Sequence, residues 1–305
     1  MNEADVQSFW NAHPCGDAII GGLHASFNDD YERFFAAYDA WRYRQESHIP
    51  ACLDRIDWRG RTVLEIGLGQ GAESEQIIRR GAVWSGLDLT SESVERVRTR
   101  LALRDLPHND VRQGSAVGIP WPDDSFDIVF SHGVLHHVPD IRRAEREIHR
   151  VLKPGGLLVA MLYARASLNY QVSIRVVRRA ALLAAYPLRR VGRVRSSALL
   201  AGHLDNAERV GLRRYLALDT FTHHNTDGPL NPYARVYSVR DVARDFPDFV
   251  VHDAYQRYMH APPLPVQGMP GERRLGWHLW VTLQARPGAP AAVSEGTRTE
   301  EVTSR

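Results

Sequence analysis

The segment VLEIGLGQGAE, Val63 to Glu73, constrains the fold of this 305-residue chain more than any other. Three glycines at alternate positions follow a short run that is typical of a buried strand, and a helix pattern begins at Ala72. A glycine-rich turn between a strand and a helix leaves backbone N–H groups and the positive helix end free to bind a phosphate or a carboxylate. The segment therefore predicts a ligand site at the edge of a sheet.

Strand and helix patterns alternate from Arg59 to Tyr163. The strand-like runs are TVLEIG, VWSGLDL, VRQG, FDIVFS and LLVAMLY, and helix patterns begin near Ala72, Thr90 and Asp140. Two further strand candidates, FVVHDAYQRYM and WHLWVTLQA, follow late in the chain. The alternation predicts a parallel sheet with helices on both faces, and the late pair predicts an antiparallel end to that sheet.

The composition is that of an ordinary soluble globular protein, with 44% hydrophobic residues and a net charge of +2 that predicts no nucleic-acid partner. Cys15 and Cys52 are too few for a disulfide framework and have no zinc-like spacing, so we expect a cytoplasmic location and no metal. The polar N-terminus and the absence of a run of about 18 apolar residues predict neither export nor integral membrane association.

Two carboxylates flank the glycine turn. Gly67, Gly69 and Ala72 loosely satisfy the dinucleotide fingerprint, but Glu65 would repel a pyrophosphate and could instead order the amino group of a zwitterionic ligand. Asp88 ends the second strand candidate, where a carboxylate can accept hydrogen bonds from both ribose hydroxyls. Nicotinamide cofactors and S-adenosylmethionine share this last feature, so Asp88 leaves both open while Glu65 favours the second.

Four successive segments resemble the motifs of class I S-adenosylmethionine-dependent methyltransferases of the small-molecule type. They are VLEIGLGQG, GLDLT, GSAVGIPWPDDSFDIVFSHGVLHHVPD and EIHRVLKPGGLLVAMLY, within residues 59–163. The resemblance implies a doubly wound, seven-stranded Rossmann-like α/β sheet with an antiparallel last strand. It also implies methyl transfer from S-adenosylmethionine to an O, N or C atom of a small molecule, in secondary metabolism, with S-adenosylhomocysteine as product. A nicotinamide-dependent oxidoreductase and a non-catalytic S-adenosylmethionine-binding protein remain the alternatives.

The cofactor contacts that the resemblance implies are Glu65, Gly67, Gly69, Gly71, Asp88, Leu89, Ser115, Ala116 and Ser131. The glycines and Glu65 would meet the methionyl part, Asp88 the ribose and Leu89 the adenine ring. Ser115 and Ala116, after the third strand, would border the amino edge of the adenine, and Ser131 would close the floor of the cofactor site. The family usually carries an acidic residue at the Ser115 position, where this chain offers a hydroxyl that can still accept a hydrogen bond.

His132 and His136 are the candidate catalytic residues. They follow the run FDIVFS, and ligands of parallel sheets lie beyond the carboxyl ends of the strands. A neutral imidazole there could accept a proton from an acceptor hydroxyl or protonated amine. We expect His137 to pack under the helix that begins at Asp140, and the alternative is that all these histidines only shape the pocket.

Pattern and charge divide the chain into five segments. They are an N-terminal helical cap (1–58), the S-adenosylmethionine-binding core (59–163), a basic helical insertion with a lid loop (164–232), the last two strands (233–285) and a tail expected to be disordered (286–305). The insertion is rich in arginine, and no acidic residue lies between Glu147 and Asp205. We interpret it as a lid with solvated arginines, with peripheral contact to an anionic membrane as an alternative. The oligomeric state is not predicted.

Overall fold

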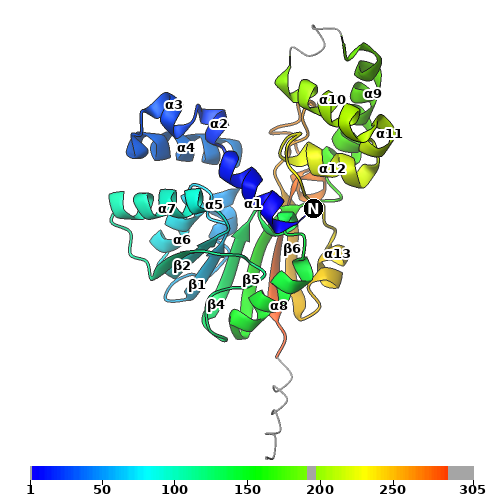
Figure 1. Ribbon diagram of the computed structural model, residues 1–305. Helices are drawn as coiled ribbons and strands as arrows, with labels where there is room; N and C mark the ends of the chain where they lie inside the picture. The colour runs from blue at the N-terminus through cyan, green and yellow to red at the C-terminus, as the bar shows by residue number, and fades with distance from the viewer. Residues whose placement is uncertain (1, 191–196, 288–305) are drawn as a thin grey trace, which may run out of the picture.

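A seven-stranded sheet in the order β3-β2-β1-β4-β5-β7-β6 forms the centre of the computed structural model, which describes residues 2–190 and 197–287 (Figure 1). The strands are β1 (Thr62–Ile66), β2 (Val83–Asp88), β3 (Asp110–Gln113), β4 (Phe126–His132), β5 (Leu152–Tyr163), β6 (Phe249–Arg257) and β7 (His278–Ala285). β7 runs antiparallel to β5 and β6, and the other neighbouring strands are parallel. The predicted sheet is therefore confirmed.

Both faces of the sheet are buried, because side chains that alternate along a strand enter two different cores. Val63 of β1 belongs to a core that includes residues of α6 (Ala72–Arg79) and α7 (Ser91–Leu103), whereas its neighbour Leu64 belongs to a core that includes residues of α8 (Ile141–Val151) and α13 (Val239–Asp245). Thr90 and Asp140, near which the sequence predicts two helices to begin, are the N-caps of α7 and α8. Their side chains accept hydrogen bonds from backbone N–H groups of the first turns of these helices. These helices leave the carboxyl ends of the strands open for a ligand.

Helices precede the sheet, as the sequence predicts. They are α1 (Glu3–Ala12), α2 (Asp17–Ile20), α3 (Leu23–Phe27), α4 (Tyr31–Gln45) and α5 (Ile49–Leu53). Buried arginines of α7 fasten them to the core: Arg96 donates to Asp17 (2.7 Å) and Arg100 donates to Asp39 (2.5 Å) and Glu75 (3.0 Å). A charge that is withdrawn from water costs several kcal/mol unless it is paired, so these ion pairs fix the position of the helices.

The insertion between β5 and α13 forms a second lobe, at the upper right in Figure 1, across from the N-terminal helices α2, α3 and α4 at the upper left. Its helices are η2 (Asn169–Arg178), α9 (Arg179–Ala185), η3 (Tyr186–Leu188), α10 (Ala198–Val210), α11 (Leu212–Tyr215) and α12 (Leu218–Thr226). Buried side chains of the lobe, such as Ile174 and Phe221, belong to the same core as β1 and β4. The lobe is thus packed against the sheet, and its role as a lid stays a prediction.

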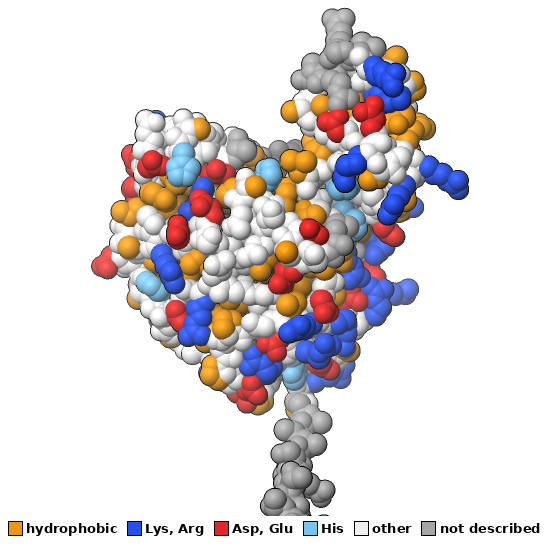
Figure 2. All heavy atoms as spheres, in the orientation of Figure 1, with side chains coloured by type: hydrophobic (Ala, Val, Ile, Leu, Met, Phe, Trp, Pro, Cys, Tyr) orange, Lys and Arg blue, Asp and Glu red, His pale blue; other side chains and the backbone are white. Residues whose placement is uncertain are grey.

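The arginines of the insertion differ in their surroundings. Figure 2 shows exposed arginine side chains beside hydrophobic ones on the lobe, at the upper right. Arg178, however, donates to the backbone carbonyls of Asn225 (2.6 Å) and Pro262 (2.9 Å), and burial lowers its pKa to about 10. The expectation that these arginines are only solvated is therefore wrong for Arg178, which holds the lobe together.

Some expectations concern residues that the structure does not describe. Arg193, Arg195 and the tail from residue 288 on lie outside the described residues. A short helix, α14 (Glu272–Leu275), interrupts the loop between β6 and β7, for which the sequence predicts no helix. No helix of the described part is both long and apolar enough to cross a membrane.

Replacement of Arg100 tests the contribution of the buried ion pairs. Arg100→Ala should lower the free energy of unfolding by about 3 kcal/mol, because Asp39 and Glu75 lose their most buried partner. Arg79 also pairs with Glu75 but its side chain is 53% exposed, so Arg79→Ala should cost less than about 1 kcal/mol. Urea denaturation monitored by circular dichroism measures both, and equal losses would contradict this account.

Candidate functional site

The turn after β1 has a conformation that glycine adopts with little strain. The φ angles of Gly67, Gly69 and Gly71 are +83°, +53° and +77°, in the left-handed region that side chains disfavour. Gly67 is also limited by space, because a Cβ atom there would lie 2.1 Å from the Cγ2 atom of Val134, in the segment that follows β4. The glycines therefore shape the turn and let it lie against the end of β4.

A cavity opens beyond the carboxyl ends of β1, β2 and β4, and α1 and α4 cover it. Its lining includes Glu3, Trp10, Cys15, Tyr38, Arg42, Glu65, Gly67, Gly69, Glu73, Asp88, Leu89, Ala116, His132, Val134 and His137. Most of the residues predicted for the cofactor thus surround one space. Among the predicted residues, Gly71, Ser115, Ser131 and His136 are not in the lining; Gly71 packs on α7, and Ser131 donates to the backbone carbonyl of Ile66 (3.0 Å) beneath the floor.

Glu65 is a buried carboxyl group in the wall of this cavity, with only 2% of its surface exposed. Trp84 donates its indole N–H to Glu65 Oε2 at 2.9 Å. Burial raises the pKa of Glu65 to about 8, and the neighbouring carboxylates Glu73 and Asp88 contribute to the increase. Glu65 is therefore largely protonated at pH 7 in the free protein, and a cation placed beside it would favour loss of that proton.

Asp88 is held rigidly at the end of β2. Its Oδ2 accepts a hydrogen bond from the N–H of Leu68 (2.7 Å), and its Oδ1 accepts from the N–H (2.8 Å) and hydroxyl (2.7 Å) of Thr90. Burial raises the pKa of Asp88, while these hydrogen bonds oppose the increase. Because the carboxylate also lines the cavity, it can accept further hydrogen bonds from a ligand without rearrangement.

The N-terminal helix supplies a carboxylate that the motifs did not indicate. Ser115 donates its hydroxyl to Glu3 Oε2 at 2.5 Å, and Glu3 lines the cavity. Gln7 of the same helix donates to the backbone carbonyl of Leu89 (2.8 Å). An acidic group therefore does reach the position after β3, but it comes from a residue 112 positions earlier in the chain. No local sequence signal connects the two.

The structure exchanges the expected positions of two neighbouring histidines. A 3-10 turn, η1 (Leu135–His137), directs His136 inward, where it is fully buried 3.8 Å from the Tyr163 ring (centroid to centroid) and neither ring nitrogen has a hydrogen-bond partner among the described residues. His137, expected to be structural, lines the cavity instead. His136 therefore does not line this cavity, and its catalytic role stays a prediction.

The hydrogen bonds of the two lining histidines fix their protons. Arg42 donates to His132 Nδ1 at 2.8 Å, so the proton of neutral His132 lies on Nε2, and that nitrogen is a donor. His137 Nδ1 donates to the carbonyl of Tyr233 (2.7 Å), which leaves the lone pair on Nε2, 3.4 Å from Asp227 Oδ2. In their neutral forms, His137 therefore has its lone pair on Nε2, whereas His132 has its proton there.

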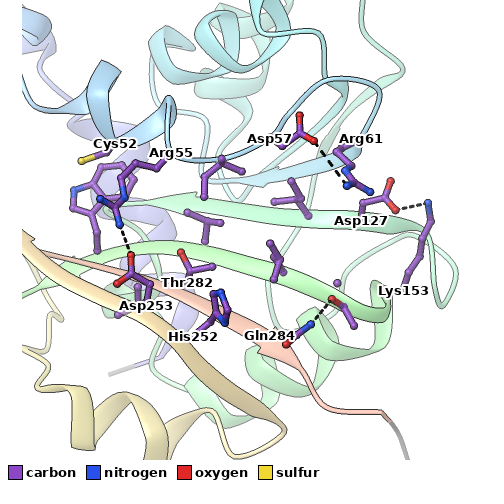
Figure 3. Close-up of a pocket in the computed structure, with 18 of the residues that line it drawn as sticks. Cys52, Arg55, Asp57, Arg61, Asp127, Lys153, His252, Asp253, Thr282 and Gln284 are labelled. Atoms are coloured by element: carbon purple, nitrogen blue, oxygen red, sulfur yellow. Dashed lines mark hydrogen bonds and ion pairs between the residues drawn. The ribbon is translucent and has the colours of Figure 1, made fainter.

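A second hollow lies elsewhere on the sheet (Figure 3). Ion pairs border it, namely Arg55 with Asp253 (2.6 Å) and Lys153 with Asp127 (2.9 Å). Asp127 and Lys153 lie near the amino ends of β4 and β5, whereas ligands of parallel sheets lie at the carboxyl ends. None of the predicted site residues lines this hollow, so the cavity at the glycine turn is the candidate site.

Comparison with known proteins finds matches to the segment that contains the glycine turn. Residues 64–160 match the family described as "Methyltransferase domain". A phthiotriol/phenolphthiotriol dimycocerosates methyltransferase of Mycobacterium tuberculosis is 35% identical over 104 residues, which are 33% of this chain and 37% of that protein. A fatty-acid O-methyltransferase of Mycolicibacterium smegmatis is 35% identical over 120 residues, 39% of this chain and 42% of that protein. The chain thus spans less than half the length of these curated relatives.

One solved structure shares the fold over most of the chain. It is a chain of the complex between the Haloferax volcanii Trm112 methyltransferase activator and the putative methyltransferase, with 16% identity and a TM-score of 0.52 over 85% of this chain and 98% of that chain. The order of the seven strands and the antiparallel β7 agree with the family match. Residues 64–160 therefore match a methyltransferase domain, and the sheet that contains them shares the fold of that solved structure.

Proposed function

We propose that this chain transfers a methyl group from S-adenosylmethionine to an O, N or C atom of a small molecule. The observation that carries the proposal is the charge of the cavity at the glycine turn. Its lining includes the carboxyl groups of Glu3, Glu65, Glu73 and Asp88, and Arg42 is the one Lys or Arg of that lining among the described residues. Such a cavity suits a ligand with cationic groups and a ribose.

The same charge disfavours a nicotinamide dinucleotide. A pyrophosphate at the glycine turn would lie beside the Asp88 carboxylate, and like charges in a poorly hydrated site repel each other strongly, while Glu65, protonated at pH 7, offers the pyrophosphate no cation. S-adenosylmethionine carries a sulfonium and an ammonium group near its one carboxylate. Arg42 reaches the same cavity from α4 and could pair with that carboxylate.

The proposed cofactor contacts come from residues in and around the wall of this cavity. Glu65 would accept hydrogen bonds from the ammonium group, and Asp88 would accept them from the ribose hydroxyls. Leu89 and Ala116 would border the adenine ring, and Glu3 together with Ser115 would accept a hydrogen bond from its amino group. In this arrangement Glu3 provides the carboxylate for which the sequence offered only a serine.

Catalysis would consist mainly of alignment. The methyl group of a sulfonium is already activated, so the protein must hold the acceptor atom in line with the departing sulfur and exclude water. An acceptor hydroxyl or protonated amine must also lose a proton. We assign that role to His137, because its Nε2 lone pair lies next to Asp227, and a proton accepted there would be shared with the carboxylate.

The acceptor class is inferred from the relatives and from the cavity wall. The names of the relatives describe methylation of dimycocerosate lipids and of fatty acids, which favours an acceptor with a long apolar part. Trp10 and Val134 provide apolar surface in the same cavity. A role in secondary metabolism and a cytoplasmic location complete the proposal.

Incubation of the whole chain with methyl-labelled S-adenosylmethionine tests the activity directly. The acceptor panel should contain fatty acids, long-chain alcohols, phenols and amines. We expect labelled product and S-adenosylhomocysteine with at least one acceptor.

Asp88→Ala should weaken cofactor binding by about 1–3 kcal/mol, since ribose hydroxyls lose their partner, whereas Asp57→Ala, at a side chain that is 78% exposed, should have no effect. Binding of a nicotinamide cofactor in place of S-adenosylmethionine, or binding without turnover on any acceptor, would contradict the proposal.

Glu65 should release its proton when the cofactor binds. At pH 7 the free carboxyl group is largely protonated because its pKa is about 8, and the ligand's ammonium group should lower that pKa. The affinity for S-adenosylhomocysteine should therefore rise between pH 6 and pH 7.5. Calorimetry in buffers of different ionisation enthalpy should count close to one released proton. Glu65→Gln should release none and bind more weakly, and the exposed control Glu95→Gln should behave as the wild type.

The assignment of His137 predicts different outcomes for the two adjacent histidines. His137→Gln should lower turnover by about 10²-fold with little change in cofactor affinity, the usual scale for a lost general base. His136→Gln should retain most of its turnover but lower the free energy of unfolding by about 1–3 kcal/mol, because the new amide is buried at a site without hydrogen-bond partners. Steady-state kinetics measure the loss of turnover, and urea denaturation measures the loss of stability. A turnover for the His136→Gln variant as low as that of His137→Gln would refute the assignment.

A further inference from the structure

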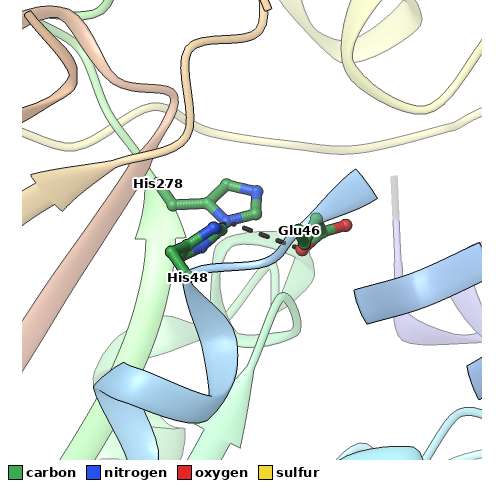
Figure 4. A group of neighbouring side chains, drawn as sticks. All are labelled: Glu46, His48 and His278. Carbon is green, nitrogen blue, oxygen red and sulfur yellow. Dashed lines mark hydrogen bonds and ion pairs between the residues drawn. The ribbon is translucent and has the colours of Figure 1, made fainter. Parts of the chain in front are cut away.

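Two histidines and a glutamate meet beside the cofactor cavity, where the turn between α4 and α5 reaches the start of β7 (Figure 4). His48 Nε2 lies 3.1 Å from His278 Nδ1, and His278 Nδ1 lies 3.7 Å from Glu46 Oε2. The three ligand-type atoms all lie within 4.8 Å of one another. The side chains of Glu46 and His278 are only 12% and 4% exposed, so the group is shielded from water.

The hydrogen bonds among the described residues leave one carboxylate oxygen of this cluster without a partner. Arg42 holds Glu46 Oε1 at 2.9 Å and so directs the other oxygen, Oε2, toward His278. Oε2 is buried and has no hydrogen-bond partner among the described residues. The two imidazoles can share a single proton at 3.1 Å, which leaves the carboxylate oxygen unpaired. A buried oxygen of this kind costs about 1–3 kcal/mol unless another group binds it.

We propose that Glu46, His48 and His278 bind a divalent transition-metal ion, with Zn²⁺ as the simplest candidate. Bonds of about 2.0–2.2 Å to imidazole nitrogen and carboxylate oxygen place neighbouring ligand atoms roughly 3–4 Å apart, which matches the separations of 3.1 Å and 3.7 Å that His278 Nδ1 makes with His48 Nε2 and Glu46 Oε2. Two imidazoles and one carboxylate suit Zn²⁺, Fe²⁺, Co²⁺ or Ni²⁺ better than Mg²⁺ or Ca²⁺. The sequence predicted no metal, because 230 positions separate the two histidines.

Three protein ligands leave a coordination position open, as in catalytic zinc sites. The ring of His132, which lines the cofactor cavity, lies 5.8 Å from the ring of His278 (centroid to centroid). An acceptor oxygen or nitrogen bound at the open position would therefore lie next to the cofactor, and the metal would lower the pKa of an acceptor hydroxyl. This role in acceptor binding rests on the proposed methyl transfer, whereas the metal site itself does not.

Titration of the metal-free whole chain with Zn²⁺, followed by calorimetry, tests the site without cofactor or acceptor. We expect one ion per chain, with a dissociation constant in the micromolar range or below. His48→Ala and His278→Ala should each weaken binding at least 100-fold. His260→Ala is a matched control, because that ring stacks on Tyr258 beside the cluster but contributes no ligand. Circular dichroism and S-adenosylhomocysteine binding verify that the variants are folded.

Visible absorption of the Co²⁺-loaded chain gives a second readout, because nitrogen and oxygen ligands shift the spectrum away from that of the aqueous ion. The shift should disappear in the two histidine variants and persist in His260→Ala. Absence of binding by the wild type, or binding that both histidine variants retain, would overturn the site. Methyl transfer that survives removal of the metal by a chelator would overturn only its role in acceptor binding. Metal binding without any methyl transfer would support the site and count against the proposed function.

Discussion

The candidate site depends on the hydrogen bonds of the buried Arg42 guanidinium. Its three nitrogens donate to Glu73 in the first turn of α6, to Glu46 at the end of α4 and to His132 at the end of β4. A guanidinium that is 9% exposed would be costly without partners, and its hydrogen bonds to Glu73 and His132 hold the N-terminal helices against the glycine turn and the sheet. The same contacts direct Glu46 toward His278 and place the proton of His132 on Nε2. One side chain thereby connects the cofactor cavity with the proposed metal site.

Electrostatics then determines which ligand fits. Glu65, Glu73 and Asp88 stand around a turn that is otherwise suited to anions, and burial keeps Glu65 protonated until a cation arrives. The positive helix end and Arg42 remain available for the single carboxylate of an amino-acid ligand. This combination explains why a turn with a loose dinucleotide fingerprint serves a sulfonium cofactor in our account.

The parts that the sequence predicted are those that local physics determines. The strands and the glycine turn follow from neighbouring residues, and so does the position of Glu65 and Asp88 at strand ends. Glu3, Arg42 and the three-residue cluster with His278 were missed, because their partners are distant in the chain and only the packing of helices on the sheet brings them together. His136 and His137 were exchanged for a different reason: a single 3-10 turn after β4 decides which ring faces the cavity, and hydrophobic periodicity does not resolve such a turn.

A crystal structure of the chain with S-adenosylhomocysteine tests the central claim most directly. The account predicts the ligand's amino group within hydrogen-bond distance of the Glu65 carboxylate and its ribose hydroxyls on Asp88. It also predicts the adenine amino group beside Ser115 and the carboxylate of Glu3, under α1. A ligand bound at the hollow of Figure 3, or one whose amino group lies away from Glu65, would contradict it.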